Sequence, residues 1–150
     1  MPAVADKIDM ALWRQCLLAV PHQPIPPRAL PFRCRPVDGC NVLIVDGSRT
    51  DIRPDKPGDD DAHPHMDFTQ GANDMEAAWV RREFGKKVLL LDNRLPPSEW
   101  PFVLYHEAGE RRYMARGDSY NVAHNKINPQ ERHLRIMAMR ARMQAVAGRR

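Results

Sequence analysis

One histidine and two glutamates stand at helical spacing in the segment Tyr105-His106-Glu107-Ala108-Gly109-Glu110. Residues four apart lie one above the other on a helix face, so His106 and Glu110 would present an imidazole and a carboxylate to one point in space. Such a pair can bind a metal ion. Glu107 is rotated by about 100° from His106 and would lie beside that point, where a carboxylate can act as a base on metal-bound water.

This pattern matches the His-Glu-x-x-His motif of metalloproteases, except that a glutamate replaces the second histidine. A catalytic zinc binds three protein ligands and keeps one position open. His124 is the candidate third ligand, because Glu110 is seven residues before Gly117 and His124 is seven residues after it. If Gly117 reverses the chain into an antiparallel helix pair, both residues lie about 10 Å of helix rise from the turn. The set His106, Glu110 and His124 suits zinc, and its ligand types are compatible with manganese, iron or nickel.

Two further residues could assist this site. Tyr120 precedes His124 by one helical turn and could donate a hydrogen bond to a developing oxyanion, or it could serve only in packing. Glu131 stands three residues after Asn128, where a capping box would place it, and it could also orient a metal-bound histidine.

Two alternatives to this metal site stay open at this point. In the first, the helix contains a packed histidine and two solvated glutamates that pair with Arg111 or Arg112. In the second, a metal binds the segment Asp59-Asp60-Asp61-Ala62-His63-Pro64-His65. The Pro- and Asp-rich surroundings of that segment favour a solvated acidic loop over a preformed site.

The composition limits the class of protein that holds these residues. The chain has 150 residues with a net charge of +4, and this length predicts one domain. No stretch approaches the roughly 18 apolar residues of a membrane span and no signal peptide is recognisable, so we expect a soluble cytoplasmic protein that does not bind a membrane. The cysteines are odd in number and form no Cys-x-x-Cys pair, so they are expected to be free thiols: Cys16, Cys34 and Cys40.

Elements that could position the site are recognisable from hydrophobic patterning. A first helix is expected over residues 5–20, and six prolines in residues 21–36 predict loop or extended cover. Short apolar runs at residues 41–46 and 87–92 predict strands, with a short helix or part of a hairpin at 74–84.

The C-terminal third predicts helices. Ser98 would cap the metal-bearing helix, which would end at Arg116, and Asp118 or Ser119 would cap a second helix after Gly117. Asn128-Pro129 predicts the end of that helix and the start of a third. The third helix would pack against the body through a stripe of four apolar residues: Ile136, Met139, Met143 and Val146.

The order of these residues resembles a family of small, mostly uncharacterised proteins of bacterial, prophage and plasmid genomes. The resemblance covers about residues 66–136. Asn73 stands where such proteins often have histidine, and the break expected at Pro129 would put Glu131 out of helical register with His124. The matching residues are Asp67-Phe68-Thr69-Gln70-Gly71, Leu91-Asp92, His106-Glu107, Glu110-Arg111, Met114, Gly117, Tyr120, Ala123-His124, Glu131 and Arg135.

The resemblance implies a zincin-like fold, with the metal bound by His106, Glu110 and His124 and with Glu107 as the base. We therefore expect an α+β fold in which a short sheet packs on the metal-bearing helix and a helical C-terminal part closes the site. Residues 1–40 would form an N-terminal helix and proline-rich cover, and residues 41–150 the zincin-like metal-binding domain. No substrate follows from the resemblance.

The expected activity is zinc-dependent hydrolysis of a peptide or amide bond in a peptide or protein substrate. Glu107 would take a proton from the metal-bound water and pass it to the leaving amine. The main rival is a non-enzymatic regulator or nucleic-acid-binding protein with a structural metal. A third possibility is a zincin that has kept the fold and lost the metal. The rival depends on the arginines that follow Glu131: Arg132, Arg135, Arg140, Arg142, Arg149 and Arg150.

Overall fold

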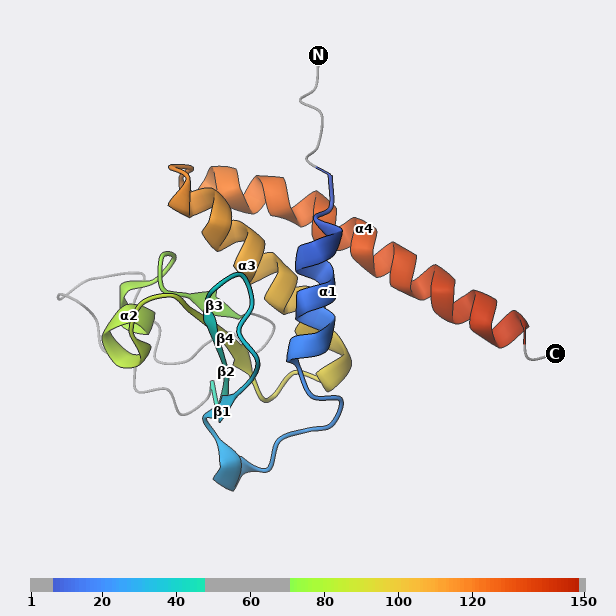
Figure 1. The fold of residues 1–150 in the computed structure, drawn as a ribbon, viewed down its shortest axis with the longest axis horizontal. Coiled ribbons are helices and arrows are strands. Elements are labelled where there is room, and N and C mark those ends of the chain that lie inside the picture. Colours follow the sequence, from blue (N-terminus) through green and yellow to red (C-terminus); the bar gives the residue numbers. More distant parts are fainter. Residues whose placement is uncertain (1–6, 48–70, 149–150) are drawn as a thin grey trace, which may run out of the picture.

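A computed structural model describes residues 7–47 and 71–148 of the chain. These residues form a mixed α+β structure, as predicted, with a four-stranded sheet and four α-helices (Figure 1). Within the described ranges, no helix has the length and apolar character needed to cross a membrane. The elements are α1 Met10–Ala19, η1 Pro27–Ala29, β1 Phe32–Arg33, β2 Asn41–Val45, β3 Ala72–Asn73, α2 Ala78–Phe84, β4 Val88–Asp92, η2 Pro97–Glu99, α3 Trp100–Ala115 and α4 Tyr120–Ala147.

The two predicted strands form the centre of the sheet, which has the order β1-β2-β4-β3. β2 and β4 pair in parallel from Asn41 opposite Val88 to Val45 opposite Asp92. β1 pairs antiparallel with β2, and β3 pairs antiparallel with β4. All five residues of β4 are buried, because helices cover both faces of the sheet, and this explains the continuous apolar run of its sequence.

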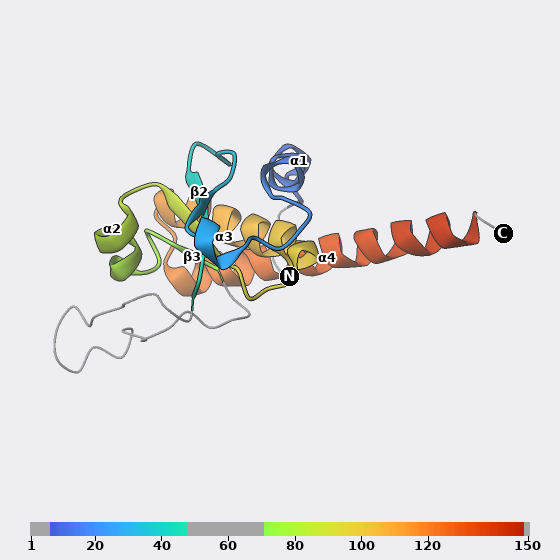
Figure 2. The ribbon, with the colours of Figure 1, turned by 90° about the horizontal axis from the view of Figure 1, so that it is seen from below.

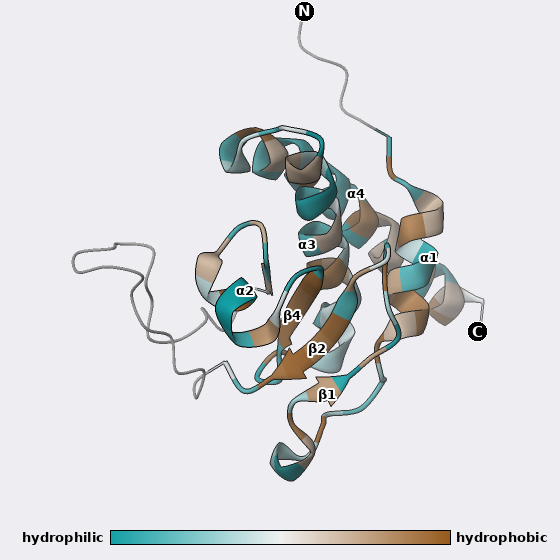
Figure 3. Cartoon of the chain, turned by 60° about the vertical axis from the view of Figure 1, so that its left-hand side comes forward, coloured by the Kyte–Doolittle hydropathy of each residue, from teal (hydrophilic) through white to brown (hydrophobic). Residues whose placement is uncertain are grey.

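Alternate residues of β4 belong to two separate apolar clusters. Leu89 and Leu91 pack in the larger cluster with α1, α3 and the first half of α4, whereas Val88 and Leu90 pack with α2. The apolar strands stand out in Figure 3, and Figure 2 shows α1 and α2 at different sides of the sheet. The sheet is therefore a rigid support for α3, the helix that bears the predicted site.

Helix α1 is shorter than predicted, because Asp9 caps it and the helix begins only at Met10. The Asp9 carboxylate accepts a hydrogen bond from the Leu12 N–H at 3.0 Å. Arg112 of α3 donates to Asp9 at 2.6 Å and to Asp38 at 3.1 Å. These contacts hold the N-terminal segment against α3, on the side of that helix away from His106.

The turn between α3 and α4 follows the prediction at Gly117 and Ser119. Gly117 has φ +108°, a conformation that favours glycine, and the Ser119 side chain accepts a hydrogen bond from the Val122 N–H. Further along the pair, a Cβ at Gly109 would collide with the Ile127 side chain. The absence of a side chain at position 109 therefore leaves room for Ile127 where α3 and α4 pack together.

Helix α4 corrects the predicted break at Asn128-Pro129. The helix is continuous over 28 residues with Pro129 inside it, so no third helix begins there and Asn128 is not a cap. A proline inside a helix removes one backbone hydrogen bond, here the one to the carbonyl of Asn125, at a cost of about 3 kcal/mol. Pro129 and Asn125 both lie on the exposed side, where water can satisfy that carbonyl, while Ile127 and Leu134 are buried against the body.

Two other predictions about the helices were wrong. Ser98 lies inside η2, and α3 begins at Trp100 after Glu99 without a side-chain cap. The stripe that begins with Ile136 does not pack against the body, because no residue of α4 after Leu134 is buried. The amphipathic periodicity shows that these apolar residues share one face of the helix, but it does not show whether another part of the protein covers that face.

Candidate metal centre

The three predicted ligands come together between the middle of α3 and the start of α4. His106 and Glu110 lie one turn apart on α3, and the His106 Nε2 is 3.1 Å from the Glu110 Oε2. His124 reaches the same oxygen from α4, with its Nδ1 at 2.9 Å. The two imidazole rings lie 5.0 Å apart between centroids. A single carboxylate oxygen thus lies between two histidine nitrogens.

These donors fit a divalent metal ion. One ligand atom from each of His106, Glu110 and His124 lies within 4.8 Å of the others. Ligand atoms of a tetrahedral zinc, at about 2.0–2.1 Å from the ion, are roughly 3.3 Å apart. The observed separations of 2.9 and 3.1 Å are therefore close to those of a zinc site and need only small side-chain shifts. Two imidazoles and one carboxylate are also a ligand set that zinc uses in catalytic sites.

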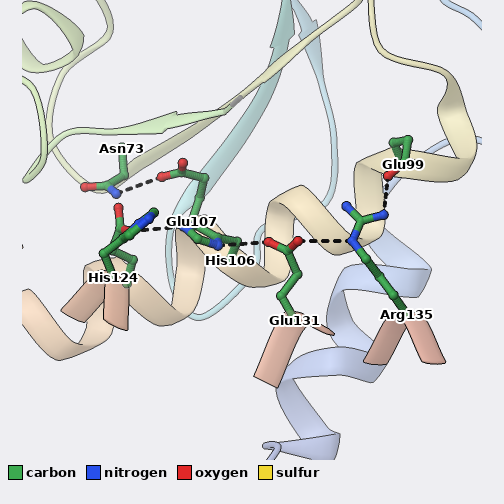
Figure 4. A network of polar contacts seen from close by, with 8 residues as sticks. Asn73, Glu99, His106, Glu107, His124, Glu131 and Arg135 are labelled. Atoms are coloured by element: carbon green, nitrogen blue, oxygen red, sulfur yellow. Dashed lines mark hydrogen bonds and ion pairs between the residues drawn. The ribbon is translucent and has the colours of Figure 1, made fainter. Parts of the chain in front are cut away.

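Glu107 lies beside these donors and is held in place by a residue of the edge strand β3. The Asn73 side chain of β3 donates a hydrogen bond to the Glu107 Oε2 at 3.0 Å (Figure 4). Asn73 is itself fixed because its side-chain oxygen accepts from the N–H groups of Met75 and Glu76 at 3.0 and 2.8 Å. The edge strand therefore orients the carboxylate that was predicted to act as the base.

Glu76 is a functional candidate that the sequence analysis missed. Glu76, Glu107 and Glu110 form a second group of possible metal ligands. One carboxylate oxygen from each of them lies within 4.8 Å of the others. Glu76 lies 31 residues before Glu107 in the sequence and belongs to no recognisable motif. The only sequence signal is its position shortly after Asn73, the residue at which the resemblance departs from the family.

Burial and mutual repulsion shift the protonation of these carboxyls. Burial, and then the charges of Glu107 and Glu110, raise the pKa of Glu76 to about 11. Burial and the charge of Glu110 raise the pKa of Glu107 to about 7, against the opposing effects of His106 and the Asn73 hydrogen bond. A carboxylate with a pKa near 7 can both accept and return a proton at neutral pH. The electrostatics of the pocket thus suit Glu107 to acid–base work.

His106 responds in the opposite direction. Burial alone would lower the pKa of its imidazole, but hydrogen bonds to Glu110 and Glu131 raise it to about 10. A proton on His106 therefore balances one of the carboxylate charges around it. The carboxyl and imidazole groups gathered here supply ligand atoms of the types that a transition-metal cation binds.

Glu131 does contact the site, contrary to the expectation that it is out of register. Because α4 is continuous, Glu131 follows His124 by two helical turns, and its Oε1 lies 2.9 Å from the His106 Nδ1. Its Oε2 accepts from Arg135 at 3.0 Å, and Arg135 also donates to Glu99 at 2.6 Å. Figure 4 shows this row of contacts from Glu99 to His106. A hydrogen bond of this kind on Nδ1 directs Nε2 toward Glu110.

Tyr120 lies at the mouth of the site but does not hydrogen bond to the ligands in the described structure. Its ring stacks on His124 with 5.3 Å between centroids. It lines a cavity of about 130 Å³ together with Gly71, Glu107 and both histidines. Burial and the nearby glutamates raise the pKa of Tyr120 to about 12, so its hydroxyl stays a hydrogen-bond donor.

The structure disagrees with the alternative of solvated glutamates paired with arginines. Glu107 and Glu110 are 5% and 1% exposed. Arg111 instead pairs with the buried Asp74 at 2.7 Å, and Arg112 pairs with Asp9 and Asp38. The second alternative, the segment 59–65, lies outside the described residues, as do Asp67-Phe68-Thr69-Gln70 of the resemblance. Asp92, another matching residue, is buried and accepts from Arg94 and from backbone N–H groups, which indicates a structural role.

Comparisons with protein-family models, with curated proteins and with solved structures gave no match to this chain. The resemblance stated above therefore stays a prediction.

Proposed function

We propose that this protein is a zinc-dependent hydrolase of zincin-like fold that cleaves peptide or amide bonds. The observation that carries the proposal is the Glu110 oxygen between the His106 and His124 nitrogens, with the buried Glu107 beside it. Buried carboxylates are unfavourable unless a cation or hydrogen bonds compensate their charge. The presence of several carboxyl groups in one pocket therefore favours a bound cation. A zinc ion held there would supply a Lewis acid that polarises the substrate carbonyl and acidifies water.

The chain's own residues would move the proton. Glu107 accepts a proton from the attacking water, whose oxygen forms a bond to the carbonyl carbon. Glu107 then delivers that proton to the leaving nitrogen as the carbon–nitrogen bond breaks, which regenerates the carboxylate. Asn73 positions the Glu107 carboxylate throughout, and the Tyr120 hydroxyl can donate to the oxyanion at the carbonyl oxygen.

The size of the cavity supports a polymer substrate of which only the scissile group enters. A cavity of about 130 Å³ has room for a few water molecules or one amide group, but not for a whole peptide. The remainder of a peptide would lie outside, across Gly71 and Tyr120. The buried, unpaired thiols of Cys16, Cys34 and Cys40 favour a reducing compartment, so we propose that this activity is cytoplasmic.

Zinc content of the purified protein tests the metal site directly. We expect about one equivalent of zinc in the wild-type protein and its loss in His124→Ala. His133→Ala is the matched control, because His133 is an exposed histidine on the same helix and should not affect metal content. Wild-type protein without zinc, or His124→Ala with unchanged zinc, would refute the proposed ligand set.

Activity against a fluorogenic peptide library tests the role of Glu107. Glu107→Gln keeps the shape of the side chain and can still accept from Asn73, but it cannot take a proton. We expect zinc content to be unchanged and turnover to fall by at least about 100-fold. Undiminished turnover in this variant would show that another group is the base.

A further inference from the structure

The second half of α4 leaves the body of the protein. Leu134 is the last buried residue of the helix, and every residue from 139 to 148 is exposed. Figures 1 and 2 show this part of α4 extending away from the sheet and from α1 and α3. Residues 136–147 are named here the α4 extension. A helix that lacks tertiary contacts gains little stability from its own chain, so a covering partner would stabilise it.

The α4 extension exposes large apolar side chains. Ile136 is 38%, Met139 49%, Met143 65% and Val146 59% exposed. At 100° per residue these four fall within a narrow arc of the helix, so they form one continuous stripe. Flexible methionine side chains adapt to the shape of a partner, and for that reason they are common in protein-recognition surfaces.

Arginines border the stripe, and no acidic residue accompanies them. Arg140 and Arg142 fall on its two sides by the same helical geometry, and both are exposed. The chain has no Asp or Glu after Glu131. Pairing of two α4 extensions would place these arginines against one another, which disfavours a second copy as the partner. The positive charges of Arg140 and Arg142 are instead complementary to a partner helix whose own apolar stripe is bordered by carboxylates.

Nucleic acid fits this surface less well. Phosphate binding needs the arginines but gives no role to the methionines and valine between them. Aromatic side chains, on which bases stack, do not occur in the α4 extension. The apolar stripe therefore favours a protein helix, for which both the methionines and the arginines have partners.

We propose that the α4 extension is a docking site for an amphipathic helix of another protein whose apolar stripe is bordered by Asp or Glu. The partner's apolar residues would cover Met139, Met143 and Val146, and its carboxylates would pair with Arg140 and Arg142. This surface is independent of the metal centre.

Two synthetic peptides of about 20 residues provide the test. Both have leucines at helical spacing, and they differ only in whether Glu or Lys borders the leucines. Fluorescence anisotropy with the full-length protein should show saturable binding of the Glu peptide and much weaker binding of the Lys peptide. Met139→Gln with Met143→Gln should weaken binding of the Glu peptide by about tenfold or more, as should Arg140→Gln with Arg142→Gln.

Matched controls separate this surface from general stickiness. Leu18→Gln removes a 64% exposed apolar side chain on α1, and Arg14→Gln removes an exposed arginine there. Neither should change binding. No saturation with the Glu peptide up to about 1 mM, equal binding of both peptides, or full binding by the methionine variants would overturn the proposal. Binding of duplex DNA that weakens steeply with salt and ignores the methionines, without peptide binding, would overturn it in favour of nucleic acid.

Discussion

Replacement of Glu131 should weaken zinc binding although Glu131 is not a proposed ligand. Its carboxylate accepts from the His106 Nδ1 at 2.9 Å and is itself held by Arg135, which is anchored to Glu99. Glu131→Ala would leave the His106 Nδ1–H without this acceptor and free the ring to rotate. Loss of such a hydrogen bond behind a metal-bound histidine typically costs 10- to 100-fold in metal affinity, or about 1.4 to 2.8 kcal/mol.

The conservative variant should lie between wild type and Glu131→Ala. Glu131→Gln can still accept from Nδ1 through its amide oxygen, but it loses the negative charge that strengthens the bond, so we expect a loss near tenfold. Competition titration against a fluorescent zinc chelator at neutral pH measures both affinities. Arg132→Gln is the control, because Arg132 is the exposed neighbour of Glu131.

The outcome distinguishes orientation from simple structural damage. Circular dichroism should show that the helix content of both Glu131 variants matches that of the wild type. Wild-type zinc affinity in Glu131→Ala, together with loss of zinc in His124→Ala, would refute the orienting role while leaving the ligand set intact.

Three further predictions concern stability. Asp74→Asn should cost about 1–3 kcal/mol in urea unfolding, because it removes the negative charge that pairs with the half-buried guanidinium of Arg111, although the amide oxygen can still accept a hydrogen bond. Burial opposes ionisation of Asp74, but the hydrogen bonds from Arg111 and the backbone hold its pKa below the usual 3.8. The ion pair therefore stabilises the fold fully at pH values well above 4. This stabilisation should fade as the pH falls below that value in the wild type, but not in Asp74→Asn. Leu134→Ala should cost about 2–5 kcal/mol while Met143→Ala changes stability by less than about 0.5 kcal/mol, and equal losses would contradict the free α4 extension. Pro129→Ala should raise the melting temperature, since it restores a backbone hydrogen bond worth up to about 3 kcal/mol; a lower melting temperature would show that proline is required there.

Much of the framework around the site follows from local sequence signals. β2 and β4 were predictable because both are short apolar runs that end at turn residues, and the Gly117 turn because only glycine readily adopts its φ. The meeting of Glu110 and His124 follows from counting residues on either side of that turn. These features depend on short sequence patterns and on one turn whose position the sequence reveals.

The remaining features depend on contacts that local patterns do not encode. β1 and β3 have two residues each, too few for any periodicity, and exist because β2 and β4 offer them edges. The break predicted at Pro129 fails because burial of Ile127 and Leu134 outweighs the local cost of one lost hydrogen bond. Glu76 reaches the site only because Asn73 holds the chain in a turn beside α3.

The absence of a side chain at Gly109 influences the distance between His106 on α3 and His124 on α4. Gly109 lies one residue before Glu110, and the Ile127 side chain occupies the space that any larger residue would need. An alanine there would force the Ile127 side chain to move or the two helices to separate, and separation would widen the gap between the proposed metal ligands without changing a ligand. In any homologue, a residue larger than glycine at this point should therefore be accompanied by a side chain smaller than isoleucine at the position of Ile127.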